Sequence, residues 1–201
     1  MLSQPRKTQE EKSRETREKI ISATIAMISE SGFSGVTTPR VAELAGVSRG
    51  ALQYHFSSKD DLVTEAVYEI SYRVDEDFQL DKVATAPLPE RISYVIDKYW
   101  SHYGSDLYLA ALEIVITSRF DKGFTDRLGD RFFSNLSNRD LEWLELFSDT
   151  GASSEERVSL RRLVLDVMRG MAMRAVISNR AAVSREVELL KQVVLERLSR
   201  Q

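Results

Sequence analysis

The chain has 201 residues, of which 42% are hydrophobic and 29% are charged, and its formal net charge is −3. This composition is ordinary for a globular protein of one domain, or of a small and a larger domain, and excludes a chain that is basic throughout. The chain contains no cysteine, which excludes disulfides and thiolate metal sites and fits the cytoplasm, where we expect the protein. No stretch has the pattern of a signal peptide or a membrane span, so we expect no membrane partner.

The first predicted helix runs from about Arg14 to Ser31, and we expect order from about residue 14. Its isoleucines at 21, 25 and 28 share one helical face. Gly32 follows, and glycine adopts the left-handed conformation that ends many helices. Residues 1–61 carry nine Lys and Arg against eight Asp and Glu, so any basic surface in this region is local and modest.

The next segment, TTPRVAELAGVSRGALQYHFSSK (residues 37–59), predicts two short helices joined by a glycine turn. Thr38 is the expected N-cap of the first short helix, with Pro39 opening its first turn. This helix is expected to bury Val41, Ala42, Leu44 and Ala45, and to stop at Gly46. Ser48 is then expected to cap a helix from Arg49 to about Tyr54, with Leu52 and Phe56 pointing inward. Two helices around a tight turn, with base-reading side chains on the second, form a helix-turn-helix.

The rest of the sequence predicts further helices and shows no sustained strand-like alternation. They are expected at about 59–80, 90–103, 107–118, 121–147, 155–179 and 184–199, with loops at 84–89 and 148–154. The stretch 107–118 is apolar almost all round, which favours a buried central helix. Its single charge, Glu113, is then expected either to pair with an arginine such as Arg119 or to bind a polar group of a ligand, and pairing is the favoured alternative.

Aromatic and methionine residues of this helical region are candidates for an apolar ligand pocket, although residues with this spacing are more often plain core. With Glu113, the candidate ligand-binding residues are Tyr99, Trp100, His102, Tyr103, Trp143, Met168 and Met171. The last two predicted helices carry wide apolar faces, including Val167, Met168, Leu190 and Val194. These faces suit either packing within the chain or dimerisation.

The run from Val47 to Phe56, followed by Ser58-Lys59-Asp60-Asp61-Leu62, resembles the signature of the tetracycline-repressor (TetR) family of transcription factors. The resemblance is specific over about residues 14–62. It implies a homodimer formed through the two C-terminal helices, a palindromic double-stranded DNA operator and a small-molecule effector bound by the body. The sequence contains no recognisable group of catalytic residues, so we expect no enzyme activity, no cofactor and no metal.

Arg49 and Gln53 are the predicted base readers, because Arg pairs with guanine and Gln with adenine in the major groove. Gly50 and Ala51 are small enough to let the helix approach the groove, and Ser48 caps that helix. The family commonly contacts the DNA backbone at the positions of Thr38, Arg40, Tyr54, His55 and Lys59. For Tyr54 and His55, burial within the head is the alternative.

These observations predict an all-α protein with a three-helix helix-turn-helix head at residues 1–58 and a helical ligand-binding and dimerisation bundle at 59–201. The predicted function is that of a ligand-responsive regulator, a repressor released from DNA by a small apolar or amphipathic molecule. The alternative is a helix-turn-helix regulator whose body binds a protein partner instead of a small molecule.

Overall fold

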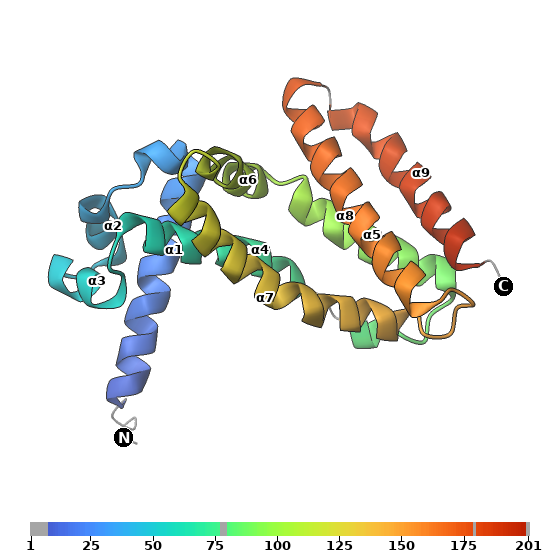
Figure 1. The fold of residues 1–201 in the computed structure, drawn as a ribbon, viewed down its shortest axis with the longest axis horizontal. Helices are drawn as coiled ribbons and strands as arrows, with labels where there is room; N and C mark the ends of the chain where they lie inside the picture. The colour runs from blue at the N-terminus through green and yellow to red at the C-terminus, as the bar shows by residue number, and fades with distance from the viewer. Residues whose placement is uncertain (1–7, 77–79, 179, 200–201) are drawn as a thin grey trace, which may run out of the picture. The chain divides into compact units, whose positions relative to one another are not determined.

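The computed structural model describes residues 8–76, 80–178 and 180–199, and in these it describes all side chains except those of 72–76, 131–139 and 180–182. All regular structure in the described residues is helical, which confirms the predicted class (Figure 1). In chain order the helices are α1 (Gln9–Gly35), α2 (Thr38–Ala45), α3 (Arg49–His55), α4 (Lys59–Glu76), the 3₁₀ turn η1 (Leu80–Lys82), α5 (Leu88–Tyr103), α6 (Asp106–Ser118), α7 (Lys122–Leu146), α8 (Ser154–Ile177) and α9 (Arg180–Leu198).

The chain forms two compact units. The first comprises residues 1–70 and 110–128, and the second comprises residues 71–109 and 129–201. The division differs from the predicted linear boundary at residue 58, because the end of α6 and the start of α7 belong to the first unit. Helices α4 and α7 each begin in the first unit and end in the second.

Helix α1 begins earlier than the predicted Arg14, because Thr8 and Glu11 form a capping box. The Thr8 side chain accepts a hydrogen bond from the Glu11 amide, and the Glu11 carboxylate accepts one from the Thr8 amide. Gly32 interrupts the helix with a φ of +63°, as the sequence predicted. The short segment from Phe33 to Gly35 follows this break.

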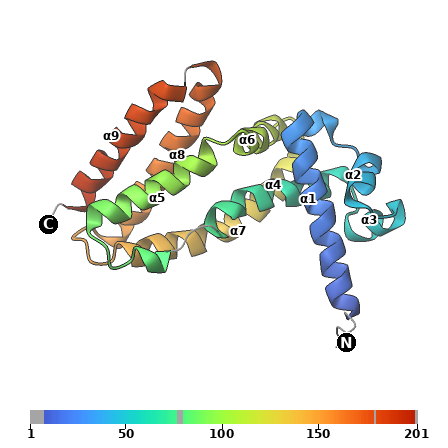
Figure 2. The ribbon, with the colours of Figure 1, turned by 180° about the vertical axis from the view of Figure 1, so that it is seen from behind.

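The core of the first unit is built from the apolar faces of its helices. Helix α1 contacts both α2 and α3, which lie beside it (Figure 2). The expectation for Leu44 was wrong: this side chain is 58% exposed, because it lines an open hollow beside α1 instead of packing into the core. Buried side chains of the first unit include Ile20, Ile25, Met27, Ile28, Val36, Val41, Leu52, Phe56, Leu62, Val63, Val67 and Ile70.

Two other boundaries differ from the sequence expectations. Helix α4 ends at Glu76 instead of about Leu80, and its predicted inward residues Val74 and Phe78 lie outside the described side chains. The predicted loop 84–89 ends sooner than expected, because Pro87 is the N-cap of α5 and Pro89 lies in its first turn. Proline is tolerated there, where the amides of a helix have no intrahelical partner.

In the second unit, α5, α8 and α9 pack against one another, as both ribbon views show (Figures 1 and 2). Helix α8 begins with a capping box between Ser153 and Glu156, which gives a sharp start after the predicted loop. Arg91 braces this loop, because its two terminal nitrogens donate to the Asp149 carboxylate at 2.8 and 2.6 Å. These contacts hold the starts of α5 and α8 in place.

Within the part of the chain that the structure describes, no helix combines the length and the apolar character needed to span a membrane.

Candidate DNA-binding and effector sites

Helices α2 and α3 meet at a turn whose geometry depends on one glycine. Gly46 has a φ of +66° and a ψ of +34°, the left-handed conformation predicted for the C-terminal end of α2. The cap of α2 itself is Thr37, one position before the predicted Thr38, which is the first residue of the helix. Ser48 caps α3 as predicted, because its hydroxyl accepts a hydrogen bond from the Ala51 amide at 3.1 Å. The two helices therefore form the predicted helix-turn-helix.

Helix α3 turns one face to the core and the other to solvent. Leu52 and the following Phe56 are buried. The predicted base readers Arg49 and Gln53 are exposed, one turn apart on the same face. Tyr54 is 82% exposed, so the alternative of a buried tyrosine is wrong.

The remaining predicted DNA contacts are distributed around this face. Gly50, Ser48 and Arg40 are exposed, whereas Thr38 and Ala51 are partly exposed. His55 is also partly exposed, and its ring lies edge-on to that of Tyr54, with the centroids 5.2 Å apart. All of these residues lie in the helix-turn-helix, and each of them is at least partly accessible to solvent.

Lys59 differs from the other predicted DNA contacts, because its ammonium group binds within the protein. Its Nζ donates to the Phe33 carbonyl oxygen at 3.0 Å and lies 4.1 Å from the centroid of the Phe33 ring. Partial burial lowers the pKa of Lys59 from its ordinary value. In this structure Lys59 ties the start of α4 to the end of α1, so a contact with phosphate stays a prediction.

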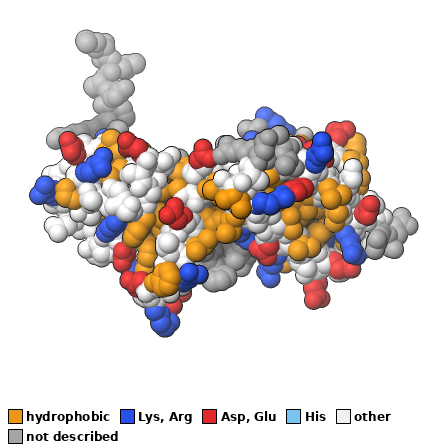
Figure 3. All heavy atoms as spheres, turned by 90° about the horizontal axis from the view of Figure 1, so that it is seen from above, with side chains coloured by type: hydrophobic (Ala, Val, Ile, Leu, Met, Phe, Trp, Pro, Cys, Tyr) orange, Lys and Arg blue, Asp and Glu red, His pale blue; other side chains and the backbone are white. Residues whose placement is uncertain are grey.

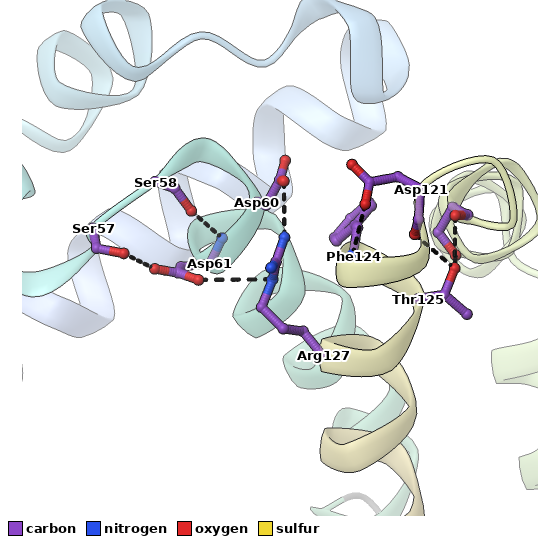
Figure 4. A network of polar contacts seen from close by, with 9 residues as sticks. Ser57, Ser58, Asp60, Asp61, Asp121, Phe124, Thr125 and Arg127 are labelled. Carbon is purple, nitrogen blue, oxygen red and sulfur yellow. Dashed lines mark hydrogen bonds and ion pairs between the residues drawn. The ribbon is translucent and has the colours of Figure 1, made fainter.

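Sequence analysis missed a second set of contacts at the start of α4, which is shown in Figure 4. Arg127 of α7 donates to the Asp60 carboxylate at 2.9 Å and has its Nε 3.9 Å from an oxygen of Asp61. Phe124, one turn earlier on α7, stacks on Phe33 with ring centroids 5.9 Å apart. No local pattern could reveal these contacts, since the partners are about 60 to 90 residues apart in the sequence.

In the second unit, the structure buries most of the predicted ligand-binding residues. Tyr99, Tyr103, Trp143, Met168 and Met171 are all buried, on α5, α7 and α8. The Tyr99 ring stacks on Trp143 with centroids 6.4 Å apart and meets Tyr103 edge-on at 6.2 Å. These residues therefore include one connected aromatic group.

Trp100 and His102 are only partly buried. The His102 ring contacts Tyr103 and also Tyr108, each with centroids 5.2 Å apart. Burial raises the pKa of Tyr108 to about 12, and its hydroxyl accepts a hydrogen bond from the Nε of Arg169 at 3.2 Å. His102 thus belongs to an aromatic and cationic group that extends from the one around Tyr99.

The expectation that Glu113 is a buried charge was wrong. Its side chain is exposed on α6, and Ile116 on the same helix is exposed too, so α6 is not buried all round. Residues 110–128 belong to the first unit, whereas the aromatic candidates belong to the second. The apolar composition of this stretch predicted burial, but hydrophobic residues also occur on protein surfaces.

The second unit buries other charges instead, and the most deeply buried of them, Arg161, was not singled out by sequence analysis. The Arg161 side chain is 1% exposed, and its Nη1 donates to Asp140 at 2.8 Å while its Nε donates to the Tyr99 hydroxyl at 3.2 Å. Asp140 also accepts a hydrogen bond from Arg162 at 2.9 Å. The available signal was weak: Arg161 lies one turn before Val164 and Leu165, on the side of α8 that carries its apolar core positions.

Comparison with known proteins agrees with this architecture. Residues 20–66 match the family described as "Bacterial regulatory proteins, tetR family". The chain is 24% identical over 174 residues to the HTH-type transcriptional regulator CymR of Pseudomonas putida, covering 87% of this chain and 86% of that protein. Matches of this kind extend the similarity beyond the helix-turn-helix into the second unit.

Two solved structures share the fold. A putative TetR-family transcriptional regulator from Mesorhizobium loti superposes with a TM-score of 0.73 at 18% identity, covering 94% of this chain and 98% of that one. FadR of Bacillus subtilis, solved in complex with stearoyl-CoA, superposes with a TM-score of 0.57 at 19% identity, covering 86% and 96%. With the helix-turn-helix geometry, the match over residues 20–66 shows that the head is of the TetR-family type, and the solved structures show that the fold of the whole chain is shared with these regulators.

Proposed function

We propose that this protein is a cytoplasmic, homodimeric repressor that binds a palindromic DNA operator and is released from it by a small apolar or amphipathic molecule. The observation that carries the proposal is the exposed face of α3, which presents Arg49 and Gln53 one turn apart on a helix held by a glycine turn and a serine cap. Such a helix fits the major groove of DNA.

In this proposal the head at residues 1–58 reads the operator. Arg49 pairs with guanine and Gln53 with adenine, while Gly50 and Ala51 allow the helix backbone to approach the bases. Thr38, Arg40, Ser48, Tyr54 and His55 contact the DNA backbone and fix the register of α3. Lys59 joins them only if its ammonium group leaves the Phe33 carbonyl.

The body at residues 59–201 is proposed to form the dimer through α8 and α9. The inward faces of these helices already bury Met168, Leu190 and Val194 within the chain. Their outward faces still expose large apolar side chains, and hydrophobic side chains also reach the surface on the face drawn in Figure 3. The exposed apolar side chains of α8 and α9 are Leu163, Val167, Met173, Val176, Ile177, Leu189 and Val193.

Gly170 supports a close helix crossing at this surface. It lies on the same face of α8 as Leu163, Val167 and Ile177, and a Cβ at this position would meet no atom of the chain within 4 Å. An exposed glycine inside a helix costs about 1 kcal/mol relative to alanine. Contact with the same helix of a second copy would offset this cost, because the missing side chain lets two helix backbones approach each other.

The aromatic group around Tyr99, Tyr103 and Trp143 is the proposed location of the effector site. FadR of Bacillus subtilis, which shares the fold, was solved in complex with stearoyl-CoA, and this supports a small-molecule role for the body. Helices α4 and α7 continue from this unit into the unit that holds the head. An effector that favours one arrangement of these helices would lower DNA affinity by linkage.

A selection from random double-stranded DNA tests the proposal. Purified protein should enrich a palindromic sequence whose half-sites lie about one helical turn apart. Enrichment of non-palindromic or unrelated sequences would contradict the proposed dimeric reader. Screening small molecules against the selected DNA complex then tests release.

A further inference from the structure

The indole nitrogen of Trp143 is a buried hydrogen-bond donor. The Trp143 side chain is 3% exposed, and among the described residues its Nε1 has no hydrogen-bond partner. A buried donor without an acceptor costs roughly 1–3 kcal/mol, so most buried donors in proteins are paired. This nitrogen is the only polar atom of the tryptophan side chain, so no other contact of the same residue compensates for the loss.

The same aromatic group also contacts a buried positive charge, Arg161. Tyr99 joins the two, since its ring stacks on Trp143 and its hydroxyl accepts a hydrogen bond from Arg161. Asp140, one turn before Trp143 on α7, pairs with both Arg161 and Arg162. One carboxylate thus serves two guanidinium groups, of which Arg161 is buried and Arg162 is exposed. The group formed by Tyr99, Asp140, Trp143, Arg161 and Arg162 is here called the Trp143 cluster.

The surroundings of the Trp143 cluster are apolar. Trp143 packs against Phe147 with ring centroids 4.6 Å apart, and Met168 and Leu165 of α8 are buried on the side of the helix that also carries Arg161. A site that joins a buried donor without an acceptor and a buried guanidinium to apolar side chains matches a molecule with an apolar body and an anionic end.

We propose that the Trp143 cluster receives the carboxylate of the effector, with the indole N–H and the Arg161 guanidinium as its donors; the effector role of this ligand rests on the proposed function. Carboxylate oxygens accept hydrogen bonds from both kinds of group, and such charge-assisted bonds are stronger than neutral ones. The effector class is therefore an apolar carboxylic acid. Glu113, had it lined the pocket, would instead have favoured a cationic ligand.

Matched probes that differ only in their polar end test the class of ligand. The probes are octanoate, octanamide and octylamine, and phenylacetate, phenylacetamide and 2-phenylethylamine, each titrated into the free full-length protein by calorimetry. We expect at least one carboxylate to bind about tenfold or more tightly than its amide and its amine, the difference expected for a hydrogen bond to a charged group. An amine or amide that binds as tightly, or a series in which no carboxylate binds, would overturn the proposal.

The variant Trp143→Phe tests the role of the donor, because it removes the N–H and keeps an aromatic ring. We expect it to weaken carboxylate binding by about tenfold while leaving the weak amine binding unchanged, because an ammonium group accepts no hydrogen bond from the indole. The matched control is Tyr94→Phe, which removes one polar group from α5 outside the cluster and should bind the carboxylate as the wild type does. Unchanged carboxylate affinity in Trp143→Phe would overturn the assignment.

The thermal shift separates this role from a purely structural one and keeps the test valid if Trp143→Phe is less stable. A structural tryptophan lowers the melting temperature equally with and without octanoate or phenylacetate, whereas a ligand donor reduces the shift that the carboxylate causes. Arg161→Lys, which keeps the charge, should retain part of that shift. This test can fail without failure of the proposed function. If an amine alone released the protein from the selected operator, the carboxylate class would be wrong, whereas the function of a ligand-responsive regulator would stand.

Discussion

The helix-turn-helix and the Trp143 cluster differ in how the sequence specifies them. The helix-turn-helix is built from contiguous residues, and its key contacts, the Gly46 turn and the Ser48 cap, join residues three to five positions apart. The Trp143 cluster joins Tyr99, Asp140 and Arg161, which are 21 to 62 positions apart. Local chemistry therefore specifies the DNA-reading surface, whereas helix packing specifies the candidate effector site.

The largest effect is expected at the proposed dimer surface of α8 and α9. Val167→Glu combined with Val193→Glu places charge on the exposed apolar faces of α8 and α9 and should give monomers in sedimentation. Operator affinity should then fall about 100-fold to 10,000-fold, because the two heads no longer bind as a linked pair. The exposed Leu141→Glu on α7 is the matched control. A double variant that remains dimeric would place the interface elsewhere.

The structure shows which apolar residues of α9 suit this test. Leu190 lay on the predicted apolar face of α9, but it is buried within the chain. A charge at Leu190 would destabilise the monomer itself and would not report on the dimer alone. Val193 and Leu189 are the exposed alternatives on the same helix.

The second effect concerns the stability of the body. Asp140→Asn removes the carboxylate that pairs with the buried Arg161, and should lower the free energy of unfolding by about 3–5 kcal/mol, the usual result of leaving a buried charge unpaired. Asp166→Asn is the control, since Asp166 forms an exposed pair with Arg169, and should cost less than about 1 kcal/mol. Urea unfolding at fixed protein concentration measures both; equal costs would show that Arg161 does not depend on Asp140.

A smaller and more specific effect is expected in the head. Arg49→Ala should lose about 1–3 kcal/mol of operator binding and relax the preference at one base pair in each half-site. Lys122→Ala, at an exposed lysine of α7, should leave both unchanged. Competition between the selected operator and its single-base variants measures the preference, and an intact preference in Arg49→Ala would show that another residue reads that base.

The smallest effect tests the turn between α2 and α3. Gly46 has a positive φ and open space around its Cβ position, so a substitution there is limited by backbone strain alone. Gly46→Ala should cost about 1–2 kcal/mol of unfolding free energy, and Gly46→Asn clearly less, because asparagine visits this conformation more readily. Thermal unfolding of both variants checks the order; an equal loss would indicate that the turn relaxes.

The sequence predicted the helix-turn-helix closely because its signals act over one or two helical turns. Gly46 and Ser48 mark helix ends through their own backbone and hydroxyl, and the structure places both as predicted. Leu44 was misassigned because hydrophobicity alone does not say which side of an eight-residue helix meets its neighbour. Even so, the error was confined to one side chain.

The body was less predictable for the same physical reason. Its helices were recognised from their periodicity, and five of the eight candidate ligand residues are indeed buried. The charges were not recognised: Glu113 was expected inside and is exposed, whereas Arg161 is buried through contacts with α5 and α7. Whether a charge is buried depends on a partner from another helix, and no local pattern identifies that partner.

The ion pairs of Arg127 also affect how fast the head and DNA find each other. Residues 1–61 have nine basic against eight acidic side chains, and two of the acidic ones are Asp60 and Asp61. Arg127, from a distant stretch of the chain, offsets their negative field at the start of α4. Without that cation the head would approach the phosphates with less long-range attraction, and association would slow most at low ionic strength, where charges act over the longest range. We therefore expect the start of α7 to contribute to the rate of DNA association without touching a base.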